Sequence, residues 1–127
     1  MHTAALVSVD IDSGLKLLDI LDKANLKVGV ALWACLAEYE DWRLILSAKE
    51  FDSHTLMDAY GLMHKALDDA KFPQAKTPVV MIVPRTETFV KQLRKYFAKT
   101  SSVEGMRLGG QMFGDRFILD AYVYRVR

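Results

Sequence analysis

Residues 28–48 constrain the fold more than any other segment, because they hold two consecutive apolar runs separated by a short acidic stretch. The sequence reads VGVALWACL, then AEYED, then WRLILSA. In both runs the larger apolar residues alternate along the chain, as expected for β-strands that face a core. The segment therefore predicts a hairpin with an exposed turn centred on Tyr39. We expect Leu36 to pair with Trp42, since this register places the more apolar sides of the two strands on one face.

A second pair of apolar runs closes the chain, with a Gly-Asp dipeptide at 114–115 that suits a tight two-residue turn. Pairing Met112 with Phe117 aligns an apolar row from each strand. These rows are Met106, Leu108, Gly110 and Met112 opposite Val123, Ala121, Leu119 and Phe117. On the other face Arg107 lies diagonal to Asp120, which predicts a cross-strand ion pair.

Three segments carry apolar residues at the i, i+3, i+4 spacing of an amphipathic helix: residues 13–24, 53–70 and 87–99. Residues 79–83, with the sequence VVMIV, are apolar throughout and lie between Pro78 and Pro84. A short strand of this composition is typical of a central position in a sheet that is covered on both faces.

Together these segments predict one α+β domain over residues 1–127, with the order α-β-β-α-β-α-β-β. We expect a single mixed, mainly antiparallel five-stranded sheet, with the three helices packed mostly on one face. The length is sufficient for one hydrophobic core.

Composition excludes several classes of protein. Apolar residues make up 51% of the chain and charged residues 26%, which is typical of a globular domain and not of a disordered one. No apolar run approaches the roughly 20 residues of a membrane-spanning helix, and the start of the chain lacks the features of a signal peptide. The single cysteine indicates a reducing compartment. We therefore expect a cytoplasmic protein without a membrane partner.

Charge is unevenly distributed along the chain. Residues 1–70 contain 6 Lys or Arg against 12 Asp or Glu, whereas residues 71–127 contain 11 against 4. This asymmetry has two interpretations: the basic half binds an anionic partner, or the halves neutralise one another within the fold or between two copies.

The basic residues of the third predicted helix are the clearest candidate for a binding surface. Basic side chains on one helix face attract phosphates, and exposed tyrosines can stack on bases. The candidate anion-binding or nucleic-acid-binding residues are Arg85, Thr86, Lys91, Arg94, Lys95, Lys99 and Arg107, and the candidate aromatic contacts are Tyr122 and Tyr124. The alternative interpretation is an ordinary solvated helix face with a capped N-terminus.

A catalytic site is less well supported. Trp33, Cys35 and Arg43 could form the floor of a pocket, with Cys35 as a weak candidate nucleophile assisted by the neighbouring guanidinium. A lone strand cysteine is more often a small buried apolar residue. The histidines and carboxylates have no spacing typical of a metal site. We therefore expect no metal and no cofactor.

The layout of the whole chain resembles a family of small bacterial α+β proteins for which no activity is established. The resemblance depends on ALWACLAEYEDWRLILSA after a leucine-rich helix and on the closing GDRFILDAYVYR. It implies a single cytoplasmic α+β domain and no particular site.

Three functions remain open at this point. The first is a non-catalytic binding or assembly module with a protein partner, either another copy or a different chain. The second is a nucleic-acid-associated protein that uses the basic helix 87–99. The third is a hydrolase or transferase with a pocket near Trp33, Cys35 and Arg43.

Overall fold

The computed structural model describes residue 6 and residues 8–39, 41–53 and 55–127. Their elements are α1 (Ser8–Lys23), β1 (Val28–Leu36), β2 (Trp42–Ala48), α2 (Lys49–Asp52), α3 (Leu56–Asp69), a 3-10 turn (Gln74–Lys76), β3 (Val80–Ile82), α4 (Thr88–Phe97), β4 (Arg107–Leu108), β5 (Gln111–Phe113) and β6 (Arg116–Val126). The α+β class and the mixed, mainly antiparallel sheet are confirmed. The strand predicted before the final turn is divided into β4 and β5 at Gly109 and Gly110.

The sheet has the order β3-β2-β1-β6-β4, and β5 also pairs with β6. Only the β2–β3 pair is parallel. The final strand β6 is therefore an interior strand that lies between β1 and the β4–β5 edge. The final strand is not available to add to another chain, because both of its sides are already paired.

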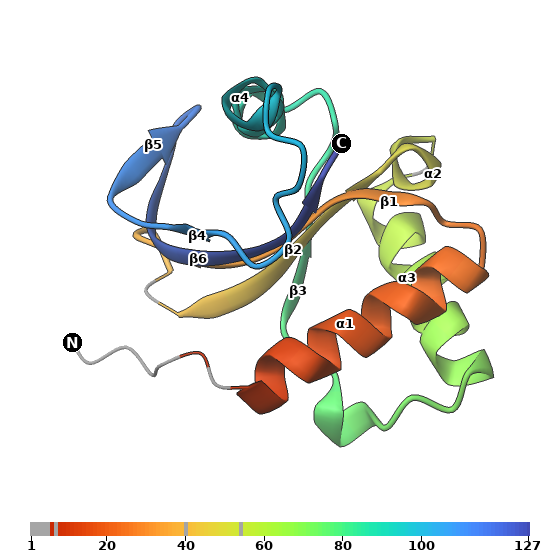
Figure 1. Cartoon of the computed structure of the whole chain (residues 1–127). Helices are drawn as coiled ribbons and strands as arrows, with labels where there is room; N and C mark the ends of the chain where they lie inside the picture. Colours follow the sequence, from red (N-terminus) through yellow and green to blue (C-terminus); the bar gives the residue numbers. More distant parts are fainter. Residues whose placement is uncertain (1–5, 7, 40, 54) are drawn as a thin grey trace.

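Helices cover both faces of the sheet, and each face has its own core. In Figure 1, α1 and α3 lie on one side of the sheet and α4 on the other. Trp33, Leu44 and Leu46 belong to the core under α1 and α3, whereas Leu32 and Ile45 belong to the core under α4. None of the helices in the described ranges is both long and apolar enough to cross a bilayer.

The expected register of the first hairpin is wrong by one residue. Cys35, not Leu36, pairs with Trp42. The shift places Leu36 and Trp42 on opposite faces of the sheet, so the two apolar rows do not share one core. Because β1 is buried on both faces, the apolar pattern does not discriminate between the two registers.

The register of the second hairpin is confirmed, with Met112 paired to Phe117 and Leu108 to Ala121. The predicted ion pair also forms, with 3.0 Å between Arg107 and Asp120. However, the pairing of β6 with β1 shifts register near its start, between Cys35 and Leu36 of β1. Such an irregularity changes which face a side chain takes. Leu119, expected in the core, is 44% exposed at this point.

The strand β3 lies at an edge of the sheet rather than at its centre, as we had expected. The backbone groups of Val79 and Val83 form hydrogen bonds with β2. The backbone groups of Val80 and Ile82 therefore point to the open side of the strand. There the Tyr60 hydroxyl accepts a hydrogen bond from the Ile82 N–H at 2.9 Å and donates to the Val80 carbonyl at 3.4 Å. Thus α3, which carries Tyr60, covers the backbone of this edge and explains how a strand so apolar can lie there.

Gly14 brings α1 close to the sheet. The Tyr124 hydroxyl donates to the carbonyl of Ile11 at 2.6 Å and accepts from the Trp33 indole N–H at 2.9 Å. A Cβ at position 14 would overlap the Tyr124 hydroxyl and lie 2.9 Å from the indole nitrogen. The glycine therefore permits a buried hydrogen-bonded link between the first helix and the strands β1 and β6.

The helix ends differ from expectation in their first residues. The helix α1 begins at Ser8 and not near Ser13. Thr55 caps α3 by accepting a hydrogen bond from the backbone N–H of Asp58. The residue before α4 is Glu87, whose side chain makes no capping bond, so the start of this helix lacks the side-chain cap that we had expected.

Candidate functional site

The outer face of α4 carries the basic residues that sequence analysis selected. The apolar face of this helix is buried against the sheet through Phe89, Val90, Leu93 and Phe97. Lys91 and Lys95 are exposed on the opposite side of α4, Lys99 is exposed in the turn that follows the helix, and Arg94 is partly buried. We call the surface formed by Lys91, Arg94, Lys95 and Lys99 the basic face.

The lysines of the basic face are not neutralised by ion pairs. Within the described part of the chain, no carboxylate forms an ion pair with Lys91, Lys95 or Lys99. Arg94 donates a hydrogen bond to the main-chain oxygen of Arg127, the last residue of the given sequence. Partial burial, and then the positive charge of Arg85, lower the pKa of Arg94, while Asp52 acts against this shift. An anion would therefore meet several uncompensated positive charges here.

Charge on the opposite side of the sheet is different. In α1 and α3, lysines pair with aspartates one helical turn away, as Lys23 does with Asp19 at 2.9 Å and Lys65 with Asp69 at 3.0 Å. The two halves of the sequence thus neutralise each other only in part. Arg116 and Arg125 from the basic half pair with Glu38 and Asp22 from the acidic half, whereas the lysines of α4 do not take part.

Several predicted site residues lie away from the basic face. Arg107 pairs with Asp120, and it is the cross-strand neighbour of Tyr122, which packs against the core under α1 and α3. It therefore lies on the other side of the sheet. Tyr124 is 6% exposed, and burial raises the pKa of its phenol. Our expectation that it is exposed is wrong, and no base can reach its ring without opening the core.

Thr86 is exposed in the loop that precedes α4, but the helix start is an acidic environment. A hollow of about 550 Å³ there is lined by Glu38, Glu87, Thr88, Gln92, Gly114, Asp115 and Arg116. Arg116 donates two hydrogen bonds to Glu87, at 2.8 and 3.0 Å, and a third to Glu38 at 2.6 Å. These bonds, those to Glu87 above all, raise the pKa of Arg116. Three carboxylates against one guanidinium oppose anion binding at this helix start, despite its favourable dipole.

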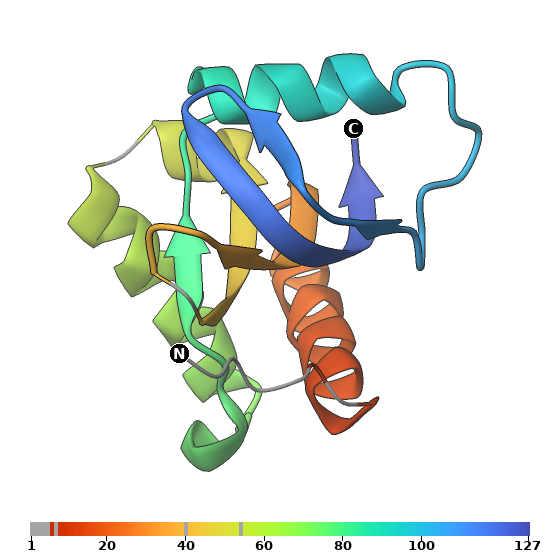
Figure 2. The same cartoon turned by 90° about the vertical axis from the view of Figure 1, so that its left-hand side faces the viewer.

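The tip of the second hairpin brings Asp115 and Arg116 to this hollow. Figure 2 shows the turn between β5 and β6 beside the first residues of α4. Gly114, with φ of 63°, comes so close that a Cβ there would lie 2.8 Å from the Phe89 backbone nitrogen. This contact was not predicted, because the residues that meet here are far apart in the chain.

The candidate nucleophile is enclosed. Cys35 is 2% exposed. Arg43 pairs with Ala34 and not with Cys35, so it lies on the opposite face of the sheet. There its guanidinium stacks on the Tyr39 ring at 3.9 Å and contacts Asp41 at 3.3 Å. The geometry therefore gives Cys35 no solvent path, and Arg43 is not the cation that would stabilise its thiolate.

One exposed aromatic residue of α4 was not among the predicted contacts. Tyr96 is 52% exposed. Its ring is held edge-on against Phe97 and Phe113, with centroid distances of 4.9 and 5.5 Å, and its hydroxyl accepts a hydrogen bond from the Gln111 amide. It is therefore a positioned aromatic surface on the flank of α4 that faces β5, beside the basic face, and it offers the contact that we had assigned to Tyr122 and Tyr124.

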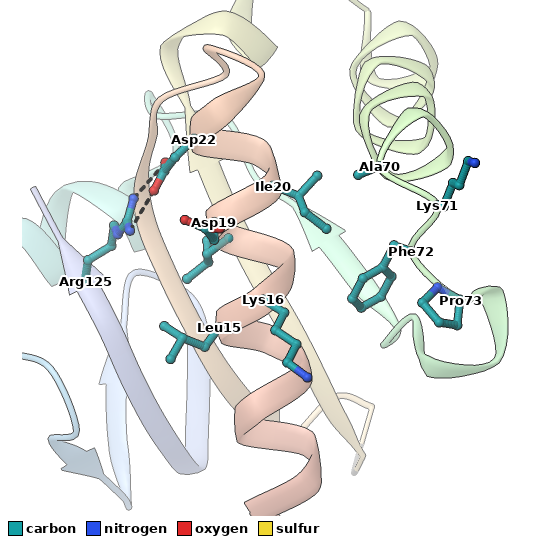
Figure 3. A pocket seen from close by; sticks show the side chains of 11 residues that line it. Leu15, Lys16, Asp19, Ile20, Asp22, Ala70, Lys71, Phe72, Pro73 and Arg125 are labelled. Carbon is teal, nitrogen blue, oxygen red and sulfur yellow. Dashed lines mark hydrogen bonds and ion pairs between the residues drawn. The ribbon is translucent and has the colours of Figure 1, made fainter.

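A groove runs along α1 on the other side of the molecule. It has a volume of about 610 Å³ and is lined by Leu15, Lys16, Leu18, Asp19, Ile20, Asp22, Ala70, Lys71, Phe72, Pro73 and Arg125. Figure 3 shows that Arg125 and Asp22 lie to one side of the helix, and that Phe72 and Pro73 lie to the other. This groove was not anticipated, since it depends on how the loop after α3 returns past α1.

Among the described residues, no three His, Cys, Asp or Glu side chains are grouped so as to hold a metal ion. His2, His54 and Glu40, which we considered at the sequence level, lie outside the described residues. Comparison with family models, with curated proteins and with solved structures found no match.

Proposed function

We propose that this protein is a non-catalytic binding module and that the basic face of α4 contacts an anionic partner. The observation that carries the proposal is the row of exposed lysines on α4 and in the turn after it, Lys91, Lys95 and Lys99, which form no ion pair with any described carboxylate. Lysines that merely solvate a helix are often paired one turn away, as Lys23 and Lys65 are here. The helix α4 also lies on the opposite side of the sheet from the acidic helices α1 and α3 (Figure 1).

The partner class that this surface fits best is a protein with an acidic surface, or a second copy that presents its α1–α3 side. The polar outer side of α4 has one exposed aromatic ring and no exposed aliphatic patch. Contacts of this kind are dominated by charge, so they depend on salt and are of moderate strength.

Charge reversal tests the proposal. The triple variant Lys91→Glu, Lys95→Glu, Lys99→Glu should lose retention on heparin and on immobilised poly-glutamate at low salt. The matched control changes Lys23, Lys65 and Lys76 to Glu, because all three are exposed away from α4 and the net charge changes equally. Light scattering of the unmodified protein at low and moderate salt measures self-association in the same buffers.

Two results would contradict the proposal. One is a wild-type protein that neither polyanion retains at low salt and that remains a monomer at high concentration. The other is equal loss of retention in the α4 variant and in the control, since this would indicate a response to net charge and not to the basic face.

Nucleic acid is a second candidate partner, and the position of Tyr96 favours it. An exposed ring on the same helix as several basic residues can stack on a base. The variant Tyr96→Leu keeps the apolar contact with Phe113 and should weaken binding of a short single-stranded DNA by roughly tenfold. Its retention on heparin should remain unchanged. Equal DNA affinity in Tyr96→Leu and wild type would remove this candidate.

A further inference from the structure

The groove beside α1 lies on the far side of the sheet from the basic face, and we infer that it is a second binding site, for a small amphipathic anion. Such a ligand has an apolar body and one carboxylate or similar group. The volume of about 610 Å³ is within the range of roughly 300–1,000 Å³ that is typical of small-molecule sites. The inference does not depend on the function proposed for α4.

The apolar part of the site lies between α1 and the loop that follows α3. Ile20 and Phe72 are partly buried and pack against the core, so their exposed surfaces are held in place. Figure 3 shows the Phe72 ring directed toward α1, with Ile20 opposite it and Pro73 beside it. Two fixed apolar walls that leave a gap favour a ligand with an apolar body.

The charges of the groove select an anion, because its acidic residues are already paired. Asp19 is paired with Lys23 at 2.9 Å, and Asp22 with Arg125 at 2.9 Å. Lys16, by contrast, forms no ion pair with any carboxylate in the described ranges. Among the described residues of α1 that line the groove, Lys16 is therefore the one positive charge without an ion pair.

The position of Lys16 suits this role. In Figure 3 its side chain leaves α1 on the same side as Phe72, whereas the Asp22–Arg125 pair lies on the other side of the helix. Lys71 also lines the groove, but its side chain points away from α1. A ligand that places its apolar body against Phe72 can therefore bring its anionic group to the Lys16 ammonium.

The probe is decanoate, titrated into isotopically labelled full-length protein and followed through the backbone amide resonances. Shifts should be confined to residues 16–23 and 70–73. The variant Lys16→Glu should weaken decanoate roughly fivefold, as expected for the loss and reversal of one exposed charge contact. The matched control Lys91→Glu should bind as wild type does, and this variant also separates the site from the basic face.

Decanol measures the contribution of charge, because it has the same apolar body without the carboxylate. It should bind more weakly than decanoate to wild type and equally to wild type and Lys16→Glu. The inference is overturned by an absence of saturable shifts, by shifts scattered over the surface, or by decanoate affinity that is equal in wild type and Lys16→Glu. Equal affinities of decanoate and decanol for wild type would also overturn it.

Discussion

Removing the hydroxyl of Tyr124 tests whether its buried hydrogen bonds hold α1 on the sheet. The variant Tyr124→Phe leaves the ring in place, and the protein loses one bond to the Ile11 carbonyl and one from the Trp33 indole. The first loss costs about 1 kcal/mol, the usual net value of a protein hydrogen bond. The second leaves a buried N–H without its partner, which costs about 1–3 kcal/mol more. We therefore expect the free energy of unfolding to fall by about 2–4 kcal/mol.

Urea unfolding followed by far-ultraviolet circular dichroism measures this change without depending on tryptophan fluorescence. A double-mutant cycle with Trp33→Phe isolates the bond between the two rings, because Tyr124→Phe should be less costly when the indole N–H is already absent. The reasoning fails if Tyr124→Phe lies within about 0.5 kcal/mol of wild type, the scatter expected for unimportant surface changes. It also fails if the two substitutions are additive.

Three further predictions concern single positions. Gly114→Ala should destabilise the protein by at least about 2 kcal/mol more than Gly110→Ala. Both positions have positive φ, but only at position 114 would the new Cβ lie within 3 Å of another atom, the Phe89 backbone nitrogen. Equal unfolding midpoints in urea would contradict this. Ser47→Ala should be neutral or stabilising by about 1 kcal/mol, since the Ser47 hydroxyl is buried without a hydrogen-bond partner among the described residues. A loss of stability of more than about 1 kcal/mol in thermal unfolding would contradict this, because it would reveal a partner. Burial raises the pKa of the Tyr124 phenol above its usual 10.0. The contribution of the protonated phenol to the free energy of unfolding is therefore complete below pH 10 and is lost as the pH rises further. The free energy of unfolding of Tyr124→Phe should fall less steeply with alkaline pH than that of wild type, and parallel pH profiles would contradict this.

Features encoded within a few residues could be predicted from sequence. The Gly-Asp turn set the pairing of Met112 with Phe117, since a two-residue turn leaves only one register. The lysines of α4 were likewise found from helical spacing alone, because one face of the helix is apolar and the other is not. The surface that supports the proposed function was therefore visible before any coordinates.

Features that depend on distant residues could not be predicted in this way. The partners of the Tyr124 hydroxyl are 91 and 113 positions away, so its polarity suggested exposure although it is buried. The register of the first hairpin was ambiguous because β1 packs against a core on both faces. A one-residue shift therefore leaves the number of buried apolar side chains in β1 unchanged. The groove beside α1 depends on the position of Phe72, which local pattern does not determine.

The hydroxyl of Tyr60 has a consequence for how copies of this protein can meet. A polymer built by strand addition needs two accepting edges in each copy, one for each neighbour. Here the Tyr60 hydroxyl already bonds the outward carbonyl of Val80 and the outward N–H of Ile82, so an incoming chain would first have to displace it. Pairing through the remaining edge would join two copies and then stop, so this fold favours a closed pair over a growing fibre.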